Sequence, residues 1–292
     1  MLGAFGRQVI DLDLSHTLAA DVIESIKMAL TEHQVLLFCG QSLSDERMRE
    51  IGNCIGEVRA LPGGFRGRET VFGVRHLTNL GEDGKPTGRH PDHFSKNWHT
   101  DGATLTPPAK ATLLYALQSP ESGGATEFAS MIAGLKAFSS AERCELSKLD
   151  AIHDVDLARV FRHGRRVIQQ DNVSFVRRMQ LWYRFFRRML PGQATVHPVL
   201  RRCEQTGRTA IMLGSDVWRI RGLGWRRGMR DVNKLIERAL RGGSVLSYCL
   251  QPDDLVIWDN RSLLHRVTDY DTESHSRVMR QVVVLEREMP AE

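Results

Sequence analysis

The chain lacks the marks of a membrane-spanning, secreted or disulfide-bonded protein. No apolar run approaches the roughly 18 residues that a membrane span needs. The N-terminal sequence MLGAFGRQVIDLDL has no basic start before an apolar stretch, so no signal peptide is expected and we predict a cytoplasmic protein. The 5 cysteines are odd in number and never spaced as CxxC, which argues against a disulfide framework and a cysteine zinc site.

Repeats and low-complexity linkers are also missing, which favours a single folded domain over residues 1–292. Hydrophobic residues make up 41% and charged residues 26% of the 292 positions, an ordinary composition for a globular protein with a sizeable core. This composition disfavours disorder and coiled coils. It leaves the oligomeric state open, so a homo-oligomer is compatible with it.

Positive charge is concentrated in one segment rather than spread along the chain. Residues 157–190 hold nine arginines and one acid, a local charge of +8 that exceeds the net +5 of the whole chain. Such a segment can be a solvated helix face, a lid over an anionic substrate, or a surface for nucleic acid or anionic membrane. Nothing in it resembles a known nucleic-acid module, so nucleic acid is the least favoured partner.

Hydrophobic periodicity predicts two early helices and a set of short strands. One helix is expected over residues 20–32 and another over 45–55, with Ser44 as N-cap and Gly56 as its end. Arg47 follows Ser44 by three positions, so the cap lacks the glutamate of a capping box. Apolar runs bounded by turn residues predict strands at 8–14, 34–40, 70–80, 111–118, 125–131, 210–213, 254–259 and 278–285.

Two further segments interrupt this pattern. Residues 56–96 are rich in Gly, Arg, Pro and Asp and read as long loops around a site, apart from the strand already noted. Residues of about 132–188 are predicted to form a helical, arginine-rich insertion between strands.

The sharpest chemical motif is WHTDG, which contains His99 and Asp101. On a strand or strand end these side chains point to the same face, where they can supply two ligands of a two-histidine, one-carboxylate iron site. An H-x-D triplet is also common as a chance surface pair. His90 and Asp92 have the same spacing, but the intervening Pro91 indicates a loop.

A third ligand must come from a distant part of the chain. The segment WDNRSLLHR, residues 258–266, offers His265 after the apolar strand LVIW. His153, His197 and His275 compete with it on chemistry alone, and a lone histidine is more often structural.

Several motifs in order along the chain together resemble one enzyme family. They are HQVLLFCGQSLSDERM, PPAKATLLYALQSPESGGATEFASM, HPVLRRCEQTGRTAIMLGSDVWRIRGL, WDNRSLLHR and RVM. The chain thereby resembles the taurine dioxygenase and 2,4-dichlorophenoxyacetate dioxygenase family of iron(II), 2-oxoglutarate-dependent oxygenases. The resemblance implies a mainly β fold with flanking helices, a double-stranded β-helix or jelly roll.

The resemblance also implies roles for five residues. His99, Asp101 and His265 match the family's iron ligands. Thr126 matches the threonine whose hydroxyl binds 2-oxoglutarate, and Arg277 matches the arginine that pairs with its distal carboxylate. A guanidinium suits that role because it holds a carboxylate by two parallel hydrogen bonds. Without the resemblance, Arg277 would be interpreted as a surface residue on an edge strand.

The sequence departs from the family's pattern at Gln281, where some members have a second arginine for an acidic substrate. Arg280 is present, but on a strand it should face away from Arg277. The loop between His265 and Arg277 is one residue longer than usual, so an alternative register with Arg280 in the site stays open. An anionic substrate is therefore in question.

Substrate contacts are expected from the loops at 56–96, the insertion and the GSDVWRI stretch. Asn79 and Asp216 are candidate polar contacts, and Trp218 is a candidate apolar wall. Each of the three also suits a turn or packing role.

The implied reaction uses Fe(II), 2-oxoglutarate and O2 to oxidise a small organic substrate, with release of succinate and CO2. Hydroxylation is the first expectation, and desaturation or cyclisation in a biosynthetic pathway are alternatives. Asp101 argues against halogenation, because its carboxylate occupies the position that a halide needs. A different class of function is a non-enzymatic jelly roll that binds nucleic acid through the arginine-rich insertion.

Overall fold

The computed structural model describes residues 3–59, 68–91, 93–158, 176, 179–180, 182–183, 186–187 and 195–287. These residues divide into two compact units. Unit 1 comprises Met1–Asn97, Pro107–Ser130 and Val245–Glu292, and unit 2 comprises Trp98–Thr106 and Met131–Ser244. The expectation of a single domain stays a prediction. Among the helices in these ranges, none is both long and apolar enough to cross a membrane.

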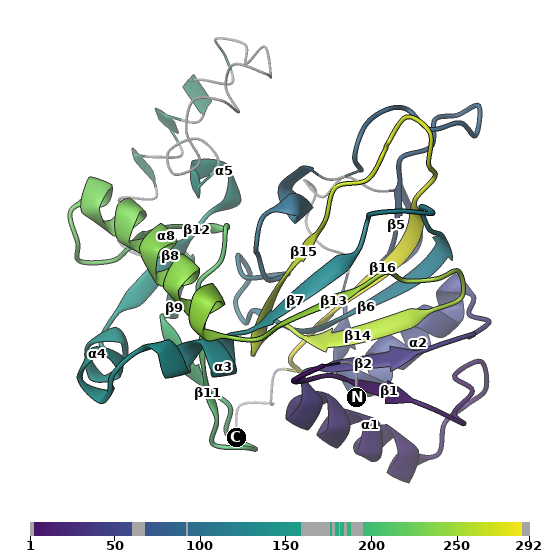
Figure 1. Ribbon diagram of the computed structural model, residues 1–292, viewed down its shortest axis with the longest axis horizontal. Coiled ribbons are helices and arrows are strands. Elements are labelled where there is room, and N and C mark those ends of the chain that lie inside the picture. Colours follow the sequence, from purple (N-terminus) through teal and green to yellow (C-terminus); the bar gives the residue numbers. More distant parts are fainter. Residues whose placement is uncertain are drawn as a thin grey trace. The chain divides into compact units, whose positions relative to one another are not determined.

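Unit 1 contains two β-sheets (Figure 1). The larger sheet has the order β1-β2-β14-β6-β16-β5-β4, with β3 paired to β16. Its strands are β1 (Arg7–Val9), β2 (Val35–Phe38), β3 (Glu57–Val58), β4 (Arg68–Val71), β5 (Val74–Thr78), β6 (Ala109–Gln118), β14 (Leu255–Asp259) and β16 (Val278–Leu285). The smaller sheet has the order β13-β7-β15, formed by β13 (Val245–Tyr248), β7 (Thr126–Ser130) and β15 (Leu263–Val267). Apart from the parallel pair β1–β2, all these pairings are antiparallel.

Alternating side chains of the larger sheet build two cores. On the outer face, Leu113 and Ile257 pack with residues of α1 (Ala20–His33) and α2 (Asp45–Ile55). On the inner face, their neighbours in sequence, including Leu114, pack with Phe128 of the smaller sheet. Unit 1 is therefore built of three layers: the helices, the larger sheet and the smaller sheet. This arrangement confirms the predicted mainly β jelly roll with flanking helices.

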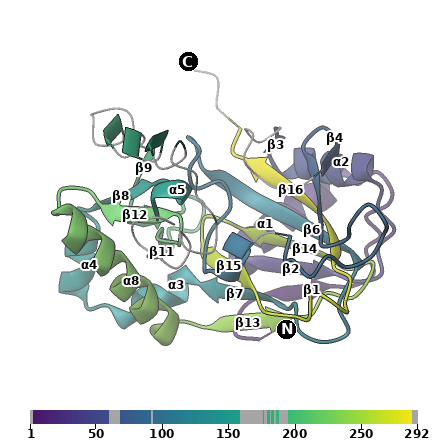
Figure 2. The ribbon, with the colours of Figure 1, turned by 90° about the horizontal axis from the view of Figure 1, so that it is seen from above.

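Unit 2 combines small sheets with one long helix (Figure 2). Its sheets are β12-β8-β9 and β10-β11. The elements are α3 (Met131–Gly134), η2 (Leu135–Ala137), α4 (Ser140–Leu146), β8 (Asp150–His153), α5 (Val155–Leu157), β9 (Thr195–Pro198), β10 (Leu200–Arg202), β11 (Thr209–Ile211), β12 (Val217–Ile220) and α8 (Trp225–Gly242). A separate apolar core contains Ile152, Leu157, Trp218 and Met229.

The predicted elements are confirmed where a local signal is strong. Helix α2 has the predicted bounds, and the Ser44 hydroxyl accepts a hydrogen bond from the Arg47 amide. Strand β16 also has the predicted bounds. The strand predicted over 8–14 is wrong beyond Val9, because Asp11 adopts a left-handed φ of 58°.

Two predicted segments are divided in the structure. The strand expected over 70–80 is the hairpin β4–β5, which turns at Gly73 with φ of 80°. A side chain at Gly73 would start 2.3 Å from Val58 Cγ1, so glycine is required there. The segment at about 132–188 contains strand β8 besides helices, and of the nine arginines at 157–190 only Arg187 lies among the described residues.

Candidate metal centre

His265 is positioned by the pairing of β15 with β7. It lies opposite Phe128, and alternation along β15 places it on the inner face with Leu263. The adjacent Arg266 faces away, where its Nε lies 2.6 Å from Glu127 Oε2. The Trp258 ring packs 4.6 Å from the His265 ring, centroid to centroid. His265 is thus held in a buried position with a fixed side-chain direction.

His99 and Asp101 lie on a loop rather than on a regular strand. His99 is a single bridge position, and Asp101 begins the turn that contains Gly102 with φ of 63°. The Leu105 amide closes this turn onto the Gly102 carbonyl at 3.0 Å. We call residues Trp98–Thr106 the ligand loop.

Three groups of unit 2 hold the ligand loop through its backbone carbonyls. The Ser215 amide donates to Trp98 O at 2.8 Å, and the Thr195 hydroxyl donates to Thr104 O at 3.0 Å. His197 Nε2 lies 3.0 Å from Ala103 O and 3.1 Å from Leu105 O. Because both acceptors are carbonyls, this nitrogen carries the proton. Burial, followed by the neighbouring His153, lowers the pKa of His197, which favours the neutral imidazole.

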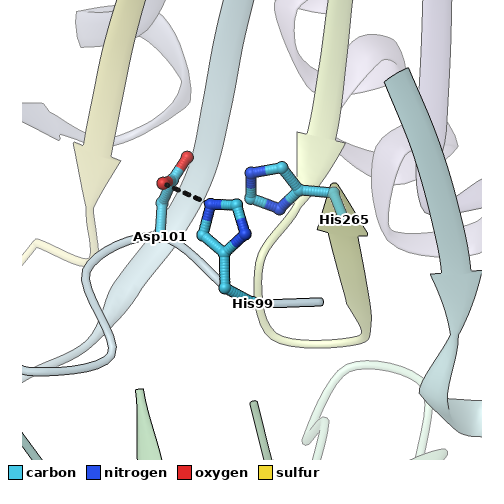
Figure 3. Close-up of side chains that lie close together, drawn as sticks. All are labelled: His99, Asp101 and His265. Carbon is cyan, nitrogen blue, oxygen red and sulfur yellow. Dashed lines mark ion pairs between the residues drawn. The ribbon is translucent and has the colours of Figure 1, made fainter. Parts of the chain in front are cut away.

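His99, Asp101 and His265 bring their ligand atoms together (Figure 3). These atoms all lie within 4.8 Å of one another, and His99 Nε2 is 3.8 Å from Asp101 Oδ1. The residues are 8%, 8% and 6% exposed. Protein ligands lie about 2.0–2.2 Å from a shared ion, so donors this close together suit a metal after a small adjustment. The set of two imidazoles and one carboxylate suits ferrous iron and leaves coordination positions open.

The other candidate histidines have different environments. Across the described ranges, the three residues above are the one group of at least three potential ligands. His197 holds the ligand loop, a role that the sequence interpretation missed because it depends on a contact between distant segments. His153 Nδ1 lies 2.5 Å from Asp216 Oδ2, with both side chains almost fully buried.

Thr126 and Arg277 have unsatisfied polar atoms in unit 1. Both residues are buried, and neither Thr126 Oγ1 nor Arg277 Nε has a hydrogen-bond partner among the residues that the structure describes. Burial lowers the pKa of Arg277 to about 10, so the guanidinium is still charged at neutral pH. A buried cation with an unsatisfied donor fits a carboxylate ligand.

Arg280 lies on the opposite face of β16. Its Nε is 2.7 Å from Asp45 Oδ1 of α2, and its guanidinium lies 5.8 Å from the centroid of the Tyr115 ring. This position favours Arg277 over Arg280 as the carboxylate-binding residue.

The three candidate substrate contacts are engaged within the protein. Asn79 Oδ1 accepts from the Arg277 amide at 2.8 Å, and its Nδ2 donates to His275 O at 2.8 Å. Asp216 contacts His153, and Trp218 is fully buried in the core of unit 2. These contacts favour structural roles for all three residues. Asn79 holds the backbone that carries Arg277.

Comparison with known proteins gives a consistent family assignment. The sequence model described as "Taurine catabolism dioxygenase TauD, TfdA family" matches residues 1–283. The alpha-ketoglutarate-dependent 2,4-dichlorophenoxyacetate dioxygenase of Cupriavidus pinatubonensis is 28% identical over 294 residues, which cover 97% of this chain and 95% of that protein. The alpha-ketoglutarate-dependent sulfate ester dioxygenase of Pseudomonas putida is 29% identical over 295 residues, covering 97% and 87%.

A solved structure extends this similarity to three dimensions. The crystal structure of AAD-2 in complex with Mn(II) and N-oxalylglycine matches with a TM-score of 0.78 and 25% identity. The match covers 98% of this chain and 97% of that one.

Proposed function

Since the chain belongs to the TauD/TfdA family of 2-oxoglutarate (alpha-ketoglutarate)-dependent dioxygenases, we propose that it hydroxylates a small organic substrate with release of succinate and CO2. The observation that carries this proposal is the buried cluster of His99, Asp101 and His265. A ferrous ion held by this set would supply the activation of O2.

The protein's own residues bind, orient and shield the reactants. His99 and His265 would offer imidazole nitrogens and Asp101 a carboxylate oxygen to the metal. Thr126 and Arg277 would hold the distal carboxylate of 2-oxoglutarate through a hydroxyl and a guanidinium. The burial of all five residues limits the access of water to the reactants.

Contact of Asn79, Asp216 and Trp218 with substrate stays a prediction, and their contacts within the protein favour supporting roles. Desaturation and cyclisation are alternative outcomes of the same cofactor chemistry, and product mass distinguishes them from hydroxylation. Cytoplasmic location, oligomeric state and nucleic-acid binding by the arginine-rich segment stay predictions from the sequence.

The function is tested by succinate formation in the purified protein with Fe(II), 2-oxoglutarate, O2 and a panel of small substrates. We expect His99→Ala and His265→Ala each to abolish turnover while circular dichroism shows an intact fold, because the scaffold has its own cores. His16→Ala is the matched control, since its ring contacts exposed Asp13 away from the cluster. Full turnover of either cluster variant at low iron would remove that residue from the ligand set.

A further inference from the structure

Two buried hydroxyl groups of unit 1 have no role in the proposed function. Tyr270 Oη and Ser119 Oγ, like Thr126 Oγ1 and Arg277 Nε, have no hydrogen-bond partner among the described residues. Buried polar groups in folded proteins are usually paired, so unpaired atoms that lie near one another point to a missing ligand.

Tyr270 lies against the start of β7, which carries Thr126. The Gly124 amide donates to Asp269 O at 3.1 Å, and the Thr268 amide donates to Ala125 O at 2.8 Å. A Cβ atom at Gly124 would lie 3.5 Å from Tyr270 Cδ1, so the ring packs directly on this backbone. The chain segment after β15 therefore brings the Tyr270 phenol to the beginning of the strand that contains Thr126.

The Arg277 guanidinium interacts electrostatically with the Tyr270 phenol. Burial raises the pKa of Tyr270, and the charge of Arg277 opposes that rise, which reflects an electrostatic interaction between the two side chains. Ser119 directly follows Gln118, which pairs with Val278. Arg277 directly precedes Val278, so Ser119 and Arg277 both adjoin this end of the β6–β16 pairing. Tyr270 thus packs beside the start of the strand that carries Thr126 and lies within electrostatic range of Arg277.

We propose that Tyr270 is a further binding residue for 2-oxoglutarate, with its Oη donating a hydrogen bond to the distal carboxylate. The inference depends on the proposed function, because it requires that Arg277 and Thr126 bind this carboxylate. An ionised carboxylate has about four acceptor sites, and an arginine fork uses two of them. The Thr126 and Tyr270 hydroxyls supply donors for the remaining sites.

The phenol has the properties that this role requires. Its raised pKa keeps it protonated at neutral pH, so it acts as a donor. It does not accept a hydrogen bond from Arg277 Nε, since that atom is itself unpaired across the described ranges. A carboxylate bound here would satisfy both groups.

Tyr270→Phe tests the proposal because it removes Oη and keeps the ring that packs on Gly124. The dissociation constant of 2-oxoglutarate is measured by anaerobic titration of the Fe(II) protein, followed by the metal-to-ligand absorption. We expect Tyr270→Phe to weaken binding about ten-fold or more, the typical effect of losing a hydrogen bond to a charged group. Tyr248→Phe is the matched control, since its hydroxyl bonds to Asp254 Oδ2 at 2.9 Å, and it should bind like the wild type.

Binding of a second ligand shows whether Tyr270→Phe acts by losing the hydrogen bond to the distal carboxylate or by disturbing the fold. 2-Oxopentanoate has the same chain length as 2-oxoglutarate but lacks the distal carboxylate, so its affinity should be unchanged in Tyr270→Phe. Unchanged 2-oxoglutarate binding, or an equal loss for both ligands, would overturn the role of Tyr270. Failure of the wild type to bind 2-oxoglutarate would instead overturn the proposed function.

Discussion

At the scale of single residues, Arg277 and Arg280 show that the side of the sheet on which an arginine lies determines which groups it can bind. Arg277 precedes the strand, is buried and has an unsatisfied Nε among the described residues. Arg280 lies on the outer face and pairs with Asp45. The sequence alone left both open as carboxylate ligands, because the loop before them has an unusual length. The register of β16 with β5 and β6 favours Arg277.

Lysine substitutions distinguish these two arginines. Arg277→Lys should weaken 2-oxoglutarate binding about ten-fold or more, because an ammonium cannot reproduce the two parallel hydrogen bonds of a guanidinium. Arg280→Lys should keep wild-type affinity, since its contacts are with Asp45 and the Leu43 carbonyl. Anaerobic titration of 2-oxoglutarate measures both. A larger loss in Arg280→Lys would establish the alternative register.

At the scale of elements, the ligand loop is held by side-chain and backbone contacts from unit 2 rather than by pairing within a regular strand. Thr195 and His197 reach it from β9, and Ser215 reaches it from the segment before β12. Local spacing made His99 and Asp101 candidate ligands, and the family resemblance implied their role as metal ligands. The sequence could not predict these supports, because β9 and the loop are separated by about ninety residues of chain.

His197 should therefore act as a positioning residue for the metal ligands. His197→Phe removes the Nε2 donor that contacts both Ala103 O and Leu105 O, and we expect weaker metal binding by about ten-fold, typical of a lost group that orients ligands. His197→Gln retains an N–H donor and should recover part of the affinity. Mn(II) titration followed by electron paramagnetic resonance measures the difference. Equal affinity in wild type and His197→Phe would assign His197 a packing role alone.

At the scale of the whole molecule, the parts predicted from the sequence are those with a local physical cause. Helix α2 is fixed by the Ser44 cap and its apolar face, and β16 by an uninterrupted apolar run. Strand β15 was not predicted, although its histidine was, because five residues carry too little periodicity. The family resemblance assigned Thr126 and Arg277 to 2-oxoglutarate binding, but Tyr270 adjoins them only because distant segments meet, so no sequence pattern revealed it.

Arg277, which has no counter-ion among the described residues, links cosubstrate binding to the stability of the fold. A guanidinium buried without a counter-ion costs free energy, and a bound carboxylate offsets that cost. With Mn(II) under anaerobic conditions, 2-oxoglutarate at about 100 times its Kd should add about 2.7 kcal/mol and raise the wild-type Tm by roughly 5 °C.

Arg277→Met should reverse this balance, because it fills the position with an apolar side chain and removes the buried charge. We expect the ligand-free variant to be more stable than the ligand-free wild type by about 1 kcal/mol or more, and to lose the response to 2-oxoglutarate. Urea unfolding with and without the ligand measures both quantities. A ligand-free variant less stable than the wild type would mean that groups within the protein already stabilise the buried guanidinium charge. Binding of the cosubstrate carboxylate would then not be needed to offset it.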